Sequence, residues 1–125
     1  MSIDCKTVTP VQKTGAAILT ANAPGDIELK SGGNKYLQLV IDVTAVAGAG
    51  TVTVTIFGRD KVSGQKYTIL ASAALGVGTT VLRVGPALTA AANLVANDFI
   101  PEDWGVNVAQ GGTSATYSIS GQLSP

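Results

Sequence analysis

The chain has 125 residues, a formal net charge of zero, 46% hydrophobic residues and only 13% charged residues. Its length suits one domain with a sizeable core, and its balanced charge lacks the basic excess expected of a nucleic-acid-binding protein. No apolar run approaches the roughly 18 residues of a membrane span, so no membrane insertion is expected. Charged residues have about half their usual frequency, which is compatible with packing inside a larger assembly.

The N-terminal segment, residues 1–15, is polar and contains no apolar stretch typical of a secretory signal. It is interpreted either as a flexible tail or as an extended arm that orders against a neighbouring subunit. Residues 16–125 are predicted to form a single β-sandwich domain. Within that domain a short strand is expected over 16–23, and after the Pro24-Gly25 turn another strand is expected over 26–30.

The clearest strands are two apolar/polar alternations on either side of a glycine-rich turn at residues 47–50. Odd positions are apolar in residues 36–46, and even positions are apolar in residues 51–57. Alternation with a period of two predicts strands with one buried face. A third strand, residues 67–72, follows the turn at residues 62–64, with its odd positions expected on one face. The short turns predict that these three strands are antiparallel neighbours in a β-meander.

The C-terminal half continues the same pattern. A strand over 79–84 ends before Pro86, an irregular connection with at most one helical turn covers 87–97, and further strands are expected over 104–109 and 115–123. The chain thus contains about seven or eight short strands separated by regular turn signals. This pattern predicts an all-β fold with little helix, either an antiparallel β-sandwich or a jelly-roll-like barrel.

The residue inventory argues against catalysis. The sequence has no histidine and a single cysteine, Cys5. It therefore lacks a Ser-His-Asp or Cys-His arrangement, a histidine metal site and an intrachain disulfide. One unpaired cysteine fits a protein that folds in a reducing cytosol. We expect no enzymatic activity, cofactor, metal or small-molecule substrate.

Three polar or aromatic features remain as candidate sites. The acidic cluster Asp98, Glu102 and Asp103 could form a calcium site or a carboxylate pair, but a solvated loop is the preferred interpretation. Residues 59–61, Arg-Asp-Lys, are expected to form a salt bridge at the rim of a hairpin. Trp104 could be a ligand platform, but its place on an apolar strand face favours the core.

Four segments beyond residue 35 form a recognisable pattern of turn and core residues. They are VIDVTAVAGAGTVTVTI, GRDKVSGQKYTILASA, TTVLRVGPALTAAANLVANDFIP and DWGVNVAQGGTSATYSISGQL. Over residues 35–123 the chain resembles a family of small proteins encoded among the head genes of tailed bacteriophages. It departs from the family pattern at residues 85–87, Gly-Pro-Ala, where Tyr-Pro-Gly is frequent, and at Lys61, where proline is common.

The resemblance implies a component of the virion. The expected role is a decoration or cement protein on the capsid surface, made in the cytoplasm of a bacterial host. Its expected partners are the major capsid protein and further copies of the same chain, with no nucleic acid or membrane. Two alternatives remain: a neck, tail or head-completion component, and a carbohydrate- or receptor-binding module on the virion surface. The scarcity of aromatic residues argues against the last.

Two features predict where a partner would bind. Apolar residues on the outward side of the alternation need either a covering layer or a partner, and these are Val40, Val46, Leu70 and Val81. The threonine-rich strand 51–57, with Thr53 and Thr55, has no charge that would discourage strand pairing. It is the candidate free edge for another chain.

Overall fold

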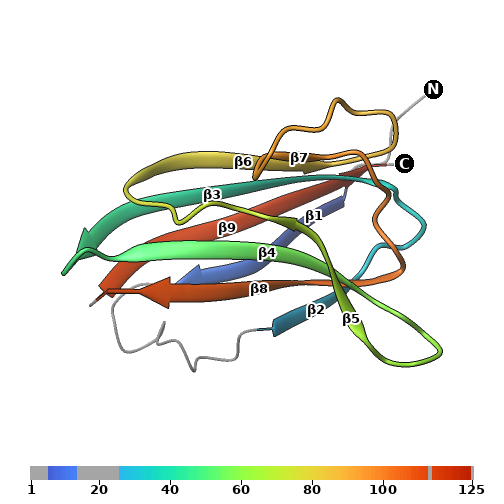
Figure 1. Cartoon of the computed structure of the whole chain (residues 1–125), viewed down its shortest axis with the longest axis horizontal. Helices are drawn as coiled ribbons and strands as arrows, with labels where there is room; N and C mark the ends of the chain where they lie inside the picture. Colours follow the sequence, from blue (N-terminus) through green and yellow to red (C-terminus); the bar gives the residue numbers. More distant parts are fainter. Residues whose placement is uncertain (1–5, 14–25, 113, 125) are drawn as a thin grey trace.

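The chain folds as an open sandwich of two β-sheets, seen in a computed structural model that describes residues 6–13, 26–112 and 114–124 (Figure 1). These residues form nine strands and no helix. The all-β sandwich predicted from the sequence is confirmed, and the sheets do not close into a barrel.

The strand order of each sheet mixes elements that are distant in the sequence. Sheet A consists, in order, of β1 (Lys6–Lys13), β9 (Ser114–Ser124), β3 (Tyr36–Ala47), β6 (Gly78–Val84) and β7 (Val95–Ala96). Sheet B consists of β2 (Asp26–Lys30), β8 (Asp103–Gly111), β4 (Thr51–Arg59) and β5 (Lys66–Ala71). All pairs are antiparallel except β6–β7, which is parallel.

The predicted three-stranded meander is wrong. β3 pairs with β6 and β9 in sheet A, whereas β4 pairs with β5 and β8 in sheet B, so only β4 and β5 form a hairpin. The glycine-rich turn at residues 47–50 crosses from one sheet to the other. Alternation identifies the apolar face of each strand, but two such faces can lie side by side in one sheet or opposite each other across the core. Here the faces of β3 and β4 lie opposite each other across the core, because β3 pairs with β9 in one sheet and β4 pairs with β8 in the other.

Two turns that connect a strand of one sheet to a strand of the other, which we call crossings, pack against each other at one end of the sandwich. The β3–β4 turn meets the β8–β9 turn at Gly112, which has φ of 70°. A Cβ at this position would lie 2.6 Å from the Gly48 carbonyl oxygen and 2.6 Å from Cα of Gly50. Glycine is therefore required here both by the left-handed backbone and by the close approach of the neighbouring turn.

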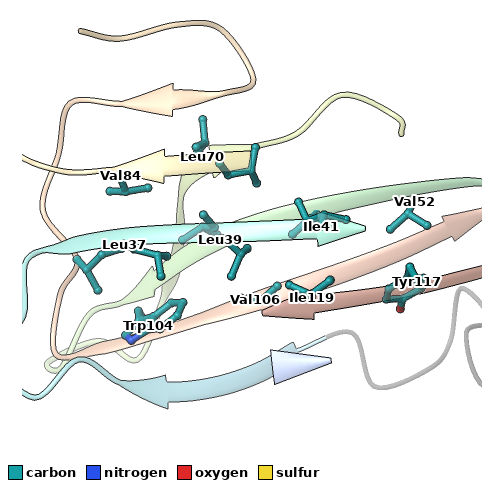
Figure 2. Close-up of a cluster of buried hydrophobic side chains, with 14 of the residues drawn as sticks. Leu37, Leu39, Ile41, Val52, Leu70, Val84, Trp104, Val106, Tyr117 and Ile119 are labelled. Carbon is teal, nitrogen blue, oxygen red and sulfur yellow. The ribbon is translucent and has the colours of Figure 1, made fainter. Parts of the chain in front are cut away.

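The core lies between the sheets and contains the apolar positions that alternation selected. Figure 2 shows Leu37, Leu39 and Ile41 of β3 directed into the space between the sheets, where Val52 of β4 and Val106 of β8 also lie. The remaining buried cluster includes Val43, Val54, Ile56, Leu70, Leu82, Val84, Ile100, Trp104, Ala115, Tyr117, Ile119 and Leu123. Trp104 is 1% exposed, so it packs in the core and cannot serve as a surface ligand platform.

A bulge in β5 changes which residues face the core. Ile56 pairs with Leu70 and Phe57 pairs with Thr68, so Ile69 is an extra residue on β5. The extra residue shifts the alternation by one position. Leu70 is consequently 8% exposed and belongs to the core, and the expected common face of the odd positions in this strand is not formed.

The predicted N-terminal arm is described in part. Residues 6–13 form β1, which pairs with β9 of the same chain, and the register shifts between Val8 and Val11. Pro10 falls within this irregularity on the outermost strand of the sheet, a position where the missing N–H of proline breaks no ladder. The strand expected over 16–23 lies outside the described residues.

The connection between β6 and β8 is irregular, as the sequence indicated. It contains one turn, in which the carbonyl of Ala91 accepts hydrogen bonds from the N–H groups of Leu94 and Val95 at 3.1 and 2.9 Å. Two-residue strand β7 follows and pairs with the end of β6. This connection therefore adds a short edge to sheet A.

Candidate interaction surface

Charged side chains gather at one end of the sandwich, the end where β2 and β4 finish and β3, β5 and β8 begin. We call it the charged end, and its described members are Lys30, Lys35, Arg59, Asp60, Lys61, Lys66, Glu102 and Asp103. The Figure 1 view places it on the right, where the β4–β5 hairpin projects.

Most acidic groups at the charged end hold the fold together. Asp103 pairs with Lys30 and, at 3.3 Å, with Lys61, and these hydrogen bonds lower the pKa of Asp103 below its ordinary value. Glu102 accepts a hydrogen bond from the N–H of Gly32 at 3.3 Å. The start of β8 is thereby tied to β2 and to the β4–β5 turn, which is a structural role for two of the three predicted acidic residues.

The third acidic residue, Asp98, accepts a hydrogen bond from the N–H of Phe99 at 2.8 Å. Over the described ranges, no group of three histidine, cysteine, aspartate or glutamate residues comes close enough to hold a metal ion. The predicted acidic cluster is therefore divided between a local turn and the two contacts above.

The turn between β4 and β5 is held by its own polar groups. Oδ2 of Asp60 accepts hydrogen bonds from the N–H and hydroxyl of Ser63 at 3.2 and 2.7 Å, and these bonds lower the pKa of Asp60. Arg59 donates to the carbonyl of Gly64 at 2.6 Å. The rim salt bridge expected within residues 59–61 thus involves Lys61 with Asp103 of another strand.

Three connections at the opposite end of the sandwich contain no charged residue in their described parts. We call it the neutral end, and it consists of residues 47–50, 72–77 and 111–112, which read AGAG, SAALGV and GG. Val77 within it is 64% exposed. Small side chains leave much backbone accessible here, and depletion of charge is typical of the centre of a protein interface.

The outer face of sheet A contains two of the predicted contact residues. Val40 and Val81 pair directly across β3 and β6, and each is half-buried. Asp42 lies two positions further along the same face, and its carboxylate accepts a hydrogen bond from Thr79 at 3.3 Å. The two valines form a small apolar patch on a largely polar face.

Val46, predicted to face outward, lies on the other side. The register of β3 against β9 shifts between Val43 and Ala45, and Val46 then pairs with Ala115, which is 1% exposed. The shift turns Val46 inward, so it packs partly buried against the core. Val46 and Leu70 thus both follow bulges that turn them inward, and a period-two pattern in the sequence does not reveal these bulges.

Thr53 and Thr55 are half-buried on the outward side of β4, but the predicted free edge is wrong. β4 lies inside sheet B, with β8 along one side and β5 along part of the other. Beyond β5 its backbone bonds to the next segment, with Ser72 N–H to Val54 C=O at 2.8 Å and Val52 N–H to Leu75 C=O at 3.0 Å. The backbone of β4 is therefore not available for another strand.

Two surface pockets were not predicted. One, of about 180 Å³ on sheet B, is lined by Thr55, Phe57, Lys66, Tyr67, Thr68 and Asn107. The ammonium of Lys66 lies 5.2 Å from the centre of the Phe57 ring. The other, of about 240 Å³ on sheet A, is lined by Tyr36, Leu37, Gln38, Arg83, Val84, Leu88, Gln122 and Ser124. Strand pairing creates both pockets, so no local sequence signal could have identified them.

Comparisons with protein-family models, with curated proteins and with solved structures found no match for this chain. The resemblance to phage head proteins stays a prediction from the sequence. Among the described residues there is no helix that could cross a membrane.

Proposed function

We propose that this chain is a structural protein of a tailed-phage head, a decoration or cement protein that binds the lattice of the major capsid protein and stabilises it. The resemblance over residues 35–123 supports a place among head proteins. A cement protein needs a rigid fold. The two sheets pack around one continuous core, and most strands are hydrogen-bonded to neighbours on both sides, which supports such rigidity.

The proposal depends most on the unequal distribution of charged residues between the two ends of the sandwich. All three described connections at the neutral end lack charged residues, and an exposed valine, Val77, lies among them. A free monomer gains solubility from surface charge, whereas a surface that is covered in an assembly gains from its absence. We assign the neutral end as the surface that contacts the capsid.

Addition of the purified chain to particles assembled without it tests this function. We expect the chain to sediment with the particles in a saturable manner and to raise the temperature at which the capsid shell dissociates, because a ligand that binds only the intact lattice stabilises it by mass action. Serum albumin serves as a control for non-specific trapping. A chain that stays in the supernatant at every concentration would contradict the proposal.

A further inference from the structure

The pocket on sheet A lies on the outer face, where strands β3, β6 and β9 approach the charged end. Most of the length of β3 separates it from the neutral end. Its lining includes the aromatic side chain of Tyr36, aliphatic side chains that include Leu88, and a row of polar side chains from Gln38, Arg83 and Gln122. A cement protein that bridges two neighbours can use a second contact surface away from the neutral end, and this pocket is a candidate for it.

The apolar wall of this pocket is fixed in place. The hydroxyl of Tyr36 donates to the carbonyl of Pro86 at 3.3 Å, and the ring lies so close to Gly85 that a Cβ there would overlap it. Leu88 lies close to the same glycine, with its Cδ1 atom 3.0 Å from the position that a Cβ of residue 85 would take. The absence of a side chain at Gly85 therefore allows the wall to form.

The loop that contributes Leu88 is held by two further hydrogen bonds. The N–H of Gly85 donates to the carbonyl of Ala96 at 3.1 Å, and the N–H of Ala87 donates to the side-chain oxygen of Asn97 at 2.9 Å. Ala87 has φ of 65°, a conformation that costs energy for a residue with a Cβ. A strained residue held by a specific side chain indicates that the loop keeps one shape.

The floor of the pocket is a row of hydrogen-bond donors across three strands. Gln38 of β3 pairs with Arg83 of β6 on one side and with Gln122 of β9 on the other. Directly opposed residues have Cβ atoms about 5 Å apart, so one guanidinium and two amides can converge on one acceptor group. A carboxylate suits this row, because it accepts several hydrogen bonds at once and pairs with arginine through both oxygens.

Arg83 is the one charged residue in the described lining of this pocket. Within the described part of the chain, Arg83 forms no ion pair. On the same face the acidic residue Asp42 is four positions from Gln38 along β3, a separation of about 13 Å. This exceeds the Debye length of about 8 Å at physiological salt, so Asp42 does little to neutralise the guanidinium.

We infer that this pocket binds an acidic side chain, of glutamate or aspartate, from a second protein chain in the capsid lattice. The inference rests on the proposed function. The pocket volume of about 240 Å³ accommodates one side chain, and Val40 and Val81 lie two positions away on the same face, where they extend the contact. Tyrosine and arginine beside an apolar patch are typical of the residues that dominate protein interfaces.

Titration of the isolated, ¹⁵N-labelled chain with N-acetyl-glutamate methylamide tests the pocket by NMR. The side-chain amide signals of Gln38 and Gln122 and the Nε signal of Arg83 are expected to shift and to saturate. The neutral analogue N-acetyl-glutamine methylamide is expected to bind at least about tenfold more weakly, because it lacks the charge that pairs with arginine. Equal shifts from both probes, or none, would overturn the inference. Tighter binding of D-glucuronate would also overturn it, in favour of a glycan ligand.

The variants R83Q and R59Q remove the same charge at different places. R83Q is expected to abolish saturation by the glutamate analogue, whereas R59Q, whose guanidinium holds the β4–β5 turn, is expected to retain it. In sedimentation with capsids, R83Q is expected to bind at least about tenfold more weakly than R59Q. If wild type and R83Q bind capsids equally well, the inferred contact through this pocket is overturned and the proposed function is not. If the wild type does not bind capsids, the proposed function is overturned. The NMR titration then still tests whether the pocket binds a carboxylate.

Discussion

At the scale of single residues, Ser72 shows how one hydroxyl completes a strand. It is 6% exposed, accepts a hydrogen bond from the N–H of Val54 at 2.9 Å and donates to the carbonyl of Ala73 at 2.7 Å. The variant S72A leaves a buried N–H without its acceptor, so we expect a loss of about 1–3 kcal/mol in the free energy of unfolding. Urea denaturation measures it, with T89A at an exposed threonine as control. Equal midpoints for S72A and T89A would contradict this role.

Tyr117 makes the stability of the chain sensitive to alkaline pH. It is 2% exposed, its hydroxyl has no partner among the described residues, and burial raises the pKa of Tyr117 to about 12. In the unfolded chain its pKa is about 10. Below pH 10 both states keep the proton, so stability is unaffected. Between about pH 10 and 12 only the unfolded state loses the proton, and the free energy of unfolding falls by on the order of 2 kcal/mol.

Comparison with Y117F isolates this effect, because the other tyrosines and the lysines titrate in both proteins. The stability difference between wild type and Y117F is expected to be constant up to about pH 10 and then to change steadily in favour of Y117F. Parallel stability curves for the two proteins up to pH 12 would show that Tyr117 is not buried as described.

At the scale of elements, Gly112 tests the packing of the two crossings. G112A places a Cβ against the backbone of the β3–β4 turn and requires a positive φ of alanine. We expect it to lower the free energy of unfolding by at least about 2 kcal/mol. G76A is the matched control, since a Cβ at Gly76 meets no atom within 4 Å. If G112A were as stable as G76A in thermal denaturation, the β3–β4 turn would not pack against the β8–β9 turn.

The elements themselves were largely predictable, and their pairing was not. Alternation located β3, β4 and β8 because one face of each is buried, and this periodicity is a local property of the sequence. Partner strands depend on residues that are distant in the sequence, as in the pairing of Tyr36 of β3 with Ser124 of β9. A hairpin and a crossing between sheets start from the same alternation and the same glycine-rich turn, so the sequence around residues 47–50 could not distinguish them.

The candidate surface was predictable only in part, for a related reason. Val40 and Val81 lie outward because no bulge precedes them in their ladder. Leu70 and Val46 follow a register shift and therefore lie inward. The pocket beside Gln38 depends on three strands that meet only in the folded sheet, so its lining could not be assembled from local patterns.

At the scale of the whole molecule, two exposed valines distinguish the ends of the sandwich. Val77 belongs to the neutral end and is 64% exposed, whereas Val62 belongs to the β4–β5 turn and is 95% exposed. V77D places a charge on the surface that we assign to the capsid, so we expect binding to capsids to weaken at least about tenfold. V62D carries the same change at the charged end and is expected to bind like wild type. Both variants are expected to keep the thermal stability of wild type, because both side chains face solvent.

The reverse result, with V62D defective and V77D unaffected, would assign the capsid contact to the charged end. Binding at the wild-type level by both variants would exclude both turns from the contact, and would contradict the assignment of the neutral end. Sedimentation with capsids provides the comparison.

The number of copies in each purified particle tests the proposed function most directly. A cement protein occupies the repeated sites of an icosahedral shell, so quantitative gel densitometry against the major capsid protein is expected to give on the order of hundreds of copies. A count of about six to twelve would indicate a single ring at the neck or tail and would contradict the account.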